Sequence, residues 1–449
     1  MLRVTCCLIM AVGLFACQPE LPPRVTQIPF VADSGHLAIR CGILIDGLAD
    51  APQYDRLVII REGRFDRITA GGFKPGRDLP LLDLSEHTCL PGLINTHTHL
   101  DYLPENANDL SVYYRRTTAE TTAIAEQNAR ENLLTGFTTI RNVGAYFPDV
   151  IYDVRDRINA GEIVGPRVRT AGPYLTIPGG GGDLVIPGHD ESEIPSAART
   201  GVARGADEFR QKAELAIVGG ADVLKVIASG AVFAFGGTPG APEMTQEEIA
   251  AVVDVAHAAG IRVTAHVHSA QSGKDAILAG VDSIEHASFL DDEAIALALE
   301  HGVAFSMDIY NGTYTEDVGR EQGYPEEFMR KNFETTETQR VVFEKAHVLG
   351  IPILFGTDAG VLPHAMGAWQ FEIMVERGMT PLAAIKSATS VPAIHMGLQD
   401  DIGAIAVGRL GDLIAVRVNP LDDISNLKNI AVVIKGGIIH RYKMDEALE

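Results

Sequence analysis

Hydrophobic residues follow two different patterns along the chain, and the change between the patterns divides it. Residues 36–90 and residues 401–443 consist of short apolar and β-branched runs separated by glycine and aspartate, a pattern that predicts short β-strands. Between these ends, strand-like apolar runs alternate with segments of helical periodicity. Because both ends share one pattern, we predict that residues 36–90 and 401–449 together form one small β-sandwich domain.

The middle of the chain, residues 91–400, predicts a barrel. Its candidate strands include GLINTHTHL at 92–100, GIRVTAHVH at 260–268 and IPILFGTDAG at 351–360, and helical patterns such as TQEEIAAVVDVAHAAG at 245–260 lie between most of the strands. About eight such strand–helix units are typical of a (β/α)8 TIM-type barrel, in which active sites lie at the carboxyl ends of the strands. The predicted fold class is therefore α/β, with a separate β domain.

The N-terminus resembles a targeting signal. Residues 1–16 place one early cation before a short apolar stretch, which fits a signal peptide and is too short to span a membrane. The stretch ends in LFAC, which resembles the lipobox of bacterial lipoproteins. This resemblance implies a lipidated Cys17, export to the periplasm and, because Gln18 follows the cysteine, anchoring in the outer membrane. Residues 17–35 are proline-rich and predict a tether. An ordinary secreted protein is the alternative.

Charge and cysteine content narrow the partners. The formal net charge of -22 argues against nucleic acid, which requires a basic surface. After the signal segment, no run is long and apolar enough to span a bilayer, so we expect membrane contact through the lipid anchor alone.

Cys41 and Cys89 remain beside Cys17 once the signal peptide is removed, and an exported chain can pair them. The sequence does not tell whether they lie close enough.

Side chains with metal-binding chemistry gather at the ends of the candidate strands. His97 and His99 end the first strand, and residues two apart in a strand point the same way. Neutral imidazole is a common metal ligand. Later strands add Lys225, His266, His268, His286 and Asp358. Each residue has a plain structural explanation, but their convergence at one end of one barrel indicates a metal site.

Lys225 needs a separate explanation, because a protonated lysine does not bind a cation and is costly to bury. A neutral lysine reacts with CO2 to give a carbamate, whose two oxygens can bridge two metal ions. The alternative is a buried lysine paired with a carboxylate such as Asp358.

These residues resemble the binuclear form of the amidohydrolase superfamily, over most of residues 36–443. The stretch GTDAGVLPHAMGAWQFEIMVERGMTPLAAIKSATS is similar to the exported, prolidase-like Xaa-Pro dipeptidase subgroup. The resemblance implies two divalent metal ions, with zinc expected, and a homo-oligomer that can be a ring of eight. The implied ligands are His97 and His99 for the first metal, His266 and His286 for the second, carboxylated Lys225 as the bridge, and Asp358 as a first-metal ligand and the catalytic proton carrier.

The implied reaction is hydrolysis of an amide bond in a dipeptide or N-acyl amino acid by a hydroxide that the two metals share. We expect cations at the pocket rim to hold a free substrate carboxylate. The candidate contacts are Arg141, His268, Tyr310 and His364. One departure from the family pattern is Asn142, where many relatives carry an acid. This departure leaves open which hydrogen bonds support the metal ligands from behind.

Two other functions stay open at this point. One is cyclic-amide or lactone hydrolysis, or deamination, by a relative of the same superfamily. Deaminases usually carry a glutamate shortly after the histidine of the fifth strand, and HVHSAQSGKD at 266–275 has none. The other is a non-catalytic, surface-anchored binding lipoprotein, against which the intact ligand set argues. Two metal ions per chain would support a hydrolase.

The lipid anchor generates a first prediction. Acyl chains on a cysteine hold a protein at a membrane by about 0.8 kcal/mol per buried methylene. We expect Cys17→Ala to leave the membrane fraction or to accumulate as uncleaved precursor, as fractionation and immunoblotting would show. A chain shortened to start at about residue 24 should be soluble and active. Recovery of that shortened chain with the membranes would reveal another anchor.

Overall fold

The computed structural model describes residues 35–75 and 79–443. Cys17, the signal segment and nearly all of the tether lie outside these described residues, so their assignment stays a prediction. Within the described residues, no helix is both long enough and apolar enough to cross a membrane.

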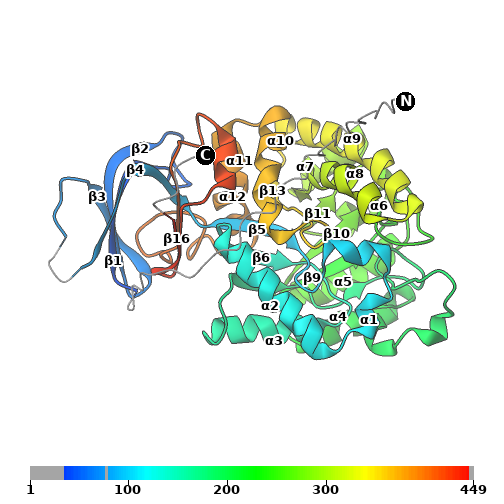
Figure 1. Cartoon of the computed structure of the whole chain (residues 1–449). Helices are drawn as coiled ribbons and strands as arrows, with labels where there is room; N and C mark the ends of the chain where they lie inside the picture. The colour runs from blue at the N-terminus through cyan, green and yellow to red at the C-terminus, as the bar shows by residue number, and fades with distance from the viewer. Residues whose placement is uncertain (1–34, 76–78, 444–449) are drawn as a thin grey trace, which may run out of the picture.

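Both ends of the described chain build one sheet (Figure 1). Its seven strands lie in the order β16-β15-β14-β4-β1-β2-β3. The two halves meet where β14 runs antiparallel to β4, with Leu413 opposite Pro91. The strands are β1 (Leu37–Leu44), β2 (Gln53–Arg61), β3 (Arg64–Ala70), β4 (Leu81–Pro91), β14 (Leu413–Val416), β15 (Val432–Lys435) and β16 (Ile438–Tyr442).

This sheet curls back on itself and encloses an apolar interior. Phe65, near the start of β3, donates its backbone N–H to Arg409 and accepts one from Gly408, both at 2.8 Å, although residues 408–409 belong to the other end of the chain. The enclosed side chains include Leu37, Ile39, Val58, Leu84 and Ile434. The predicted β-sandwich domain made from both chain ends is therefore present as one curled sheet.

A disulfide joins Cys41 to Cys89, with a Cα–Cα distance of 5.9 Å. The two cysteines lie on β1 and β4, which run parallel and adjacent in the sheet. Strand pairing thus supplies the proximity that the sequence left open.

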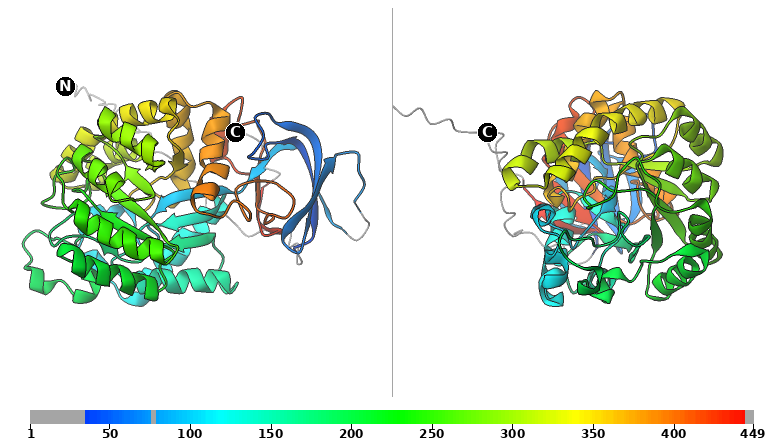
Figure 2. Two further views of the ribbon diagram at one scale, coloured as in Figure 1. Left: turned by 180° about the vertical axis from the view of Figure 1, so that it is seen from behind. Right: turned by 90° about the vertical axis from the view of Figure 1, so that its right-hand side faces the viewer.

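The central part of the chain forms the predicted barrel of parallel strands surrounded by helices (Figure 2). One sheet has the order β5-β6-β7 and the other β13-β12-β11-β10-β9-β8. Single parallel bridges, Thr98 to Ala359 and Ala145 to Pro173, connect the two sheets. The strands are β5 (Leu93–Thr98), β6 (Phe137–Asn142), β7 (Arg167–Thr170), β8 (Tyr174–Leu175), β9 (Val223–Ile227), β10 (Arg262–Val267), β11 (Ser283–His286), β12 (Ala304–Met307) and β13 (Ile353–Phe355).

The helices cover the outside of the strands (Figure 2). Several begin at an N-cap that the sequence encodes: Thr245 accepts the N–H of Glu248, and the Glu248 side chain accepts the N–H of Thr245. The helices are α1 (Val112–Arg115), α2 (Thr118–Leu134), α3 (Pro148–Asn159), α4 (Gly205–Val218), α5 (Gln246–Ala258), α6 (Ala270–Leu278), α7 (Asp292–His301), α8 (Asn311–Gln322), α9 (Glu326–Leu349), α10 (Gln370–Glu376), α11 (Pro381–Ser387) and α12 (Ser390–His395).

Burial explains why barrel strands such as β9 and β13 are rich in apolar residues. Every residue of β5 and of β9 is buried, because one face lines the barrel and the other lies under helices. A lysine or histidine on such a strand is therefore removed from water unless it lies at the strand end, where the pocket opens. Of the polar residues on these two strands, His97 and Lys225 line the pocket.

Candidate metal centre

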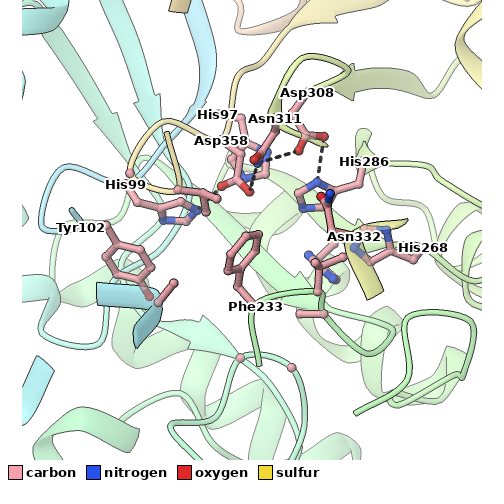
Figure 3. Close-up of a pocket in the computed structure, with 18 of the residues that line it drawn as sticks. His97, His99, Tyr102, Phe233, His268, His286, Asp308, Asn311, Asn332 and Asp358 are labelled. Atoms are coloured by element: carbon pink, nitrogen blue, oxygen red, sulfur yellow. Dashed lines mark hydrogen bonds and ion pairs between the residues drawn. The ribbon is translucent and has the colours of Figure 1, made fainter. Parts of the chain in front are cut away.

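The donor residues proposed from the sequence come together in one pocket at the carboxyl ends of the strands (Figure 3). His97 lies on β5 and His99 just after it, Lys225 is on β9, His266 is on β10 and His268 just after it, His286 ends β11, and Asp358 follows β13. Strand order alone therefore brings residues from far apart in the sequence to one end of the barrel.

His97, His99 and Asp358 form the first group of donors. The Oδ1 of Asp358 lies 3.3 Å from Nε2 of His97 and 3.2 Å from Nε2 of His99. Ligand atoms that each stand about 2.0–2.2 Å from one tetrahedral zinc ion lie about 3.3–3.6 Å from one another. The Asp358 carboxylate thus lies within reach of both histidines, and His97, His286 and Asp358 each offer one ligand atom within 4.8 Å of the others.

A second group consists of His266, His268 and His286, whose nitrogen atoms lie within 4.8 Å of one another. Burial lowers the pKa of both His266 and His268 well below the ordinary value. Both rings are therefore neutral and can offer a nitrogen lone pair to a cation. His268, which the sequence analysis lists as a substrate contact, lies among these possible ligands as well as on the pocket wall.

The second ring nitrogens of His97 and His286 are held by neighbours. Nδ1 of His97 lies 2.7 Å from Glu285 and Nδ1 of His286 lies 2.9 Å from Asp308. A histidine that donates its Nδ1–H to a carboxylate keeps its Nε2 lone pair free, and such pairs are typical behind metal-binding histidines. The arrangement presents the Nε2 atoms to the pocket, and the donor set fits two divalent cations.

Glu285 is fully buried beneath the donors and has two strong partners. It accepts a hydrogen bond from Arg141 at 2.6 Å, while Arg141 also donates its Nε–H to the carbonyl of Thr96. Burial alone would raise the pKa of Glu285, but the charge of Arg141 and the hydrogen bond from His97 hold it well below its usual range. Glu285 is therefore an anion that fixes His97.

Lys225 lies inside the pocket wall and is almost completely buried. Burial lowers its pKa to about 8, although Glu285 and Asp358 oppose the shift. A larger share of this amine than of an exposed lysine is therefore neutral near pH 7, and a neutral amine is the form that can react with CO2.

Backbone strain is concentrated at the site. The described non-glycine residues with positive φ include His286 at 66°, Ala287 at 61° and Asp358 at 55°. Such conformations cost about 1–3 kcal/mol each and persist when the surrounding structure fixes them. Here they set the direction of the chain at the end of β11 and three residues after β13, where His286 and Asp358 line the pocket.

The other candidate substrate contacts have different surroundings. Arg141 is engaged with Glu285, and His364 donates to the His99 carbonyl at 3.2 Å while accepting from Asn132. Tyr310 packs against residues of α8 and of the segment after β13. None of Arg141, Tyr310 and His364 is among the described residues that line the pocket. A substrate contact by any of these three residues stays a prediction.

Asn142 also acts behind the site. Its Oδ1 accepts the N–H of Leu100 at 2.7 Å, and its amide donates to the carbonyl of Gly144. His99 contacts the same carbonyl through Nδ1 at 3.1 Å. The Asn142 amide therefore holds the turn after β5. An acid at this position could not donate the hydrogen bond to the carbonyl of Gly144.

Sequence reasoning missed Glu285, Asp308 and the pocket wall. Glu285 directly precedes His286 in the short strand SIEH, and an acid beside a candidate ligand in a strand is a usable signal for a buried, paired acid. Asp308 lies one residue beyond β12 and gave no signal, because its importance depends on His286 from another strand. The remaining pocket residues come from the loops after several strands and from α8 and α9.

Comparisons with known proteins agree with this fold. The fold and the donors define a class of metal-dependent hydrolases built on a parallel barrel. The model of the Amidohydrolase family matches residues 88–439, and the chain belongs to that family.

Three relatives illustrate the similarity. Ochratoxinase of Aspergillus niger is 31% identical over 369 residues, which span 78% of this chain and 74% of that enzyme. A crystal structure of a Xaa-Pro dipeptidase with methionine bound in its active site is 35% identical, with a TM-score of 0.84 over 90% of this chain and 100% of that one. A prolidase complexed with N-methylphosphonate-L-proline is 26% identical, with a TM-score of 0.85 over 91% of this chain and 100% of that one.

The ion pair beneath the site generates a second prediction. Arg141→Met would leave Glu285 buried without its cation, and we expect a loss of about 3–5 kcal/mol in the free energy of unfolding. Denaturant unfolding measures this loss. The double variant Arg141→Met/Glu285→Gln should recover much of it. A stable Arg141→Met enzyme with a raised KM would instead identify Arg141 as a substrate contact.

Proposed function

We propose that this protein is a metal-dependent hydrolase that cleaves the amide bond of a dipeptide or an N-acyl amino acid. The observation that carries the proposal is the convergence of His97 and His99 on Asp358, beside the histidine group that includes His286. Similarity to ochratoxinase and to Xaa-Pro dipeptidases supports an amide bond as the target.

Two divalent cations, when bound, would supply an acidified water molecule and polarise the amide carbonyl. The chain would contribute the proton transfers. The Asp358 carboxylate lies in the pocket and also accepts a hydrogen bond from Asn311 at 3.1 Å. Interaction with His97 and His99 keeps the pKa of this carboxyl well below its usual value despite burial, so it enters the reaction as a base.

In the proposed sequence, Asp358 takes the proton of the attacking water and then delivers it to the departing amine nitrogen. Asn311 would hold the carboxylate in place during both transfers, because its amide also approaches Asp308 at 3.3 Å. Water adds to the carbonyl carbon, the carbon–nitrogen bond breaks, and a carboxylic acid and an amine are released.

Three further properties belong to the proposal. Lys225 would carry a carbamate that bridges the two cations, with zinc as the expected metal. The protein would be exported and held at the outer membrane through Cys17. It would assemble as a homo-oligomer.

The proton-transfer role of Asp358 can be tested by substitution. Asp358→Asn keeps the size of the side chain and removes the base, so we expect turnover to fall by about 10²–10⁴. Turnover should be measured on a library of dipeptides and N-acyl amino acids, with metal content determined in parallel. Unchanged turnover at unchanged metal content would exclude this role.

The carbamate can be tested by chemical rescue. Lys225→Ala should lose activity and bound metal, and short-chain carboxylic acids should partly restore both by supplying the missing carboxylate. Lys331 is an equally buried lysine that donates to the carbonyl of Ala234, so Lys331→Ala is a matched control in which no rescue is expected. Full activity and metal content in Lys225→Ala would contradict the proposal.

A further inference from the structure

A cluster of tyrosines lines one side of the pocket and reaches a candidate metal ligand. The aromatic side chains in the pocket lining include Tyr102, Tyr113, Tyr146, Tyr174 and Phe233. The rings of the four tyrosines contact one another. Figure 3 shows Tyr102 beside His99, on the side of the pocket away from His268. The proposed hydrolysis leaves the hydroxyls of these tyrosines without a role.

The ring of His99 has two neighbours at the nitrogen that is not turned toward Asp358. Its Nδ1 lies 3.1 Å from the carbonyl oxygen of Gly144 and 3.0 Å from the hydroxyl oxygen of Tyr174. A carbonyl oxygen can only accept a hydrogen bond, so Nδ1 carries the proton. The neutral ring therefore keeps its lone pair on Nε2, which lies 3.2 Å from Oδ1 of Asp358.

The Tyr174 hydroxyl is able to accept the Nδ1–H of His99 because its own proton is used elsewhere. It donates to the hydroxyl of Tyr102 at 2.9 Å, which leaves its oxygen lone pairs for the imidazole. Tyr102 also stacks on the His99 ring, with ring centroids 4.9 Å apart and an interplanar angle of 25°. Two linked tyrosines therefore hold one imidazole, one at its edge and the other at its face.

Two glycines leave the space that this arrangement needs. A Cβ atom at Gly144 would lie 2.2 Å from Cε1 of Tyr174, and a Cβ atom at Gly360 would lie 2.8 Å from Cβ of Tyr102. Both glycines have positive φ, 134° and 119°, which other residues rarely adopt. The Tyr174 ring therefore packs directly on the residue whose carbonyl contacts His99.

His99 differs in this respect from two other candidate ligands. Glu285 holds Nδ1 of His97, and Asp308 holds Nδ1 of His286. Hydrogen bonds to a carboxylate are about twice as strong as those between neutral groups. Because the two acceptors at His99 are a carbonyl and a phenol, the orientation of this ring depends on both of them.

We infer that Tyr174 is a positioning residue for the first of the two proposed cations: its hydroxyl accepts the Nδ1–H of His99 and keeps the Nε2 lone pair directed at that cation. Tyr102 supports it by orienting the Tyr174 hydroxyl. The inference rests on the metal site of the proposed function and adds the group that fixes one of its ligands. Loss of such a partner behind a metal-binding histidine typically weakens metal affinity by about 10–100-fold.

Metal retention tests the inference without requiring a substrate. Tyr174→Phe keeps the ring and removes the hydroxyl. Zinc release from the metal-loaded full chain, measured against a chelator of known affinity, should show one ion bound about 10–100-fold more weakly and the other unchanged. In the cobalt-loaded protein, the visible absorption of that same ion should change, because His99 would be its ligand. A general loss of packing would not single out one ion.

Tyr113→Phe is the matched control. Tyr113 belongs to the same cluster, with its ring centroid 4.5 Å from that of Tyr102, and the described contacts of the His99 ring nitrogens do not include it. This variant should retain both ions as the wild type does. Tyr102→Phe is a second test variant, because it keeps the Tyr174 hydroxyl and removes the acceptor that orients it. It should weaken the same ion, by less than Tyr174→Phe does.

The outcomes separate this inference from the proposed function. Unchanged retention in Tyr174→Phe, or equal weakening in Tyr174→Phe and Tyr113→Phe, would overturn the inference. If Tyr174→Phe does not fold, Tyr102→Phe decides: selective weakening of one ion supports the inference, and unchanged retention overturns it. A wild type that retains two ions but hydrolyses no dipeptide or N-acyl amino acid would refute the proposed function, and metal retention would still decide the inference. A wild type that binds no ion would overturn both.

Discussion

The buried ion pair between Arg141 and Glu285 is the constraint on which the site depends. It joins β6 to β11, and Arg141 also holds the carbonyl of Thr96 on β5. A buried pair of this kind adds little net stability, because desolvation offsets the attraction, but losing one partner is costly. The pair therefore fixes the relative positions of three strands. These strands have to be in register before His97 can donate to Glu285 and turn its Nε2 toward Asp358.

Residues that lie on strands were predictable, and the groups that orient them were less so. His97, His99, Lys225, His286 and Asp358 stand out because a charged or imidazole side chain contradicts an apolar strand. The barrel was predicted from the alternation of strand and helix patterns in the middle of the chain. The β domain was predicted from the short strand patterns that both ends share. A partner that lies on another strand gives no such signal in the sequence. The contacts of Arg141 and His364 with Glu285 and the His99 carbonyl were not predictable in this way, because these partners come from other elements.

The pocket walls show why substrate preference is harder to predict than chemistry. The chemistry is fixed by donors at the strand ends, where the backbone leaves little freedom. The walls combine loops after several strands with two later helices, and their packing is a property of the tertiary structure. Relatives that share the donors can therefore differ in what they bind, and Phe233 is placed by contacts with Tyr324 and Phe328 that no local pattern reveals.

The sheet that both chain ends share has a consequence for the order in which the protein is made. Strands β1 to β4 are synthesised first, and the Cys41–Cys89 pair lies wholly within them. The edge of β4 that pairs with β14 then stays open until the whole barrel has been synthesised. An open strand edge is a template for association with other chains. During biogenesis this edge is the point at which the growing chain is most exposed to aggregation, and the last strands close it.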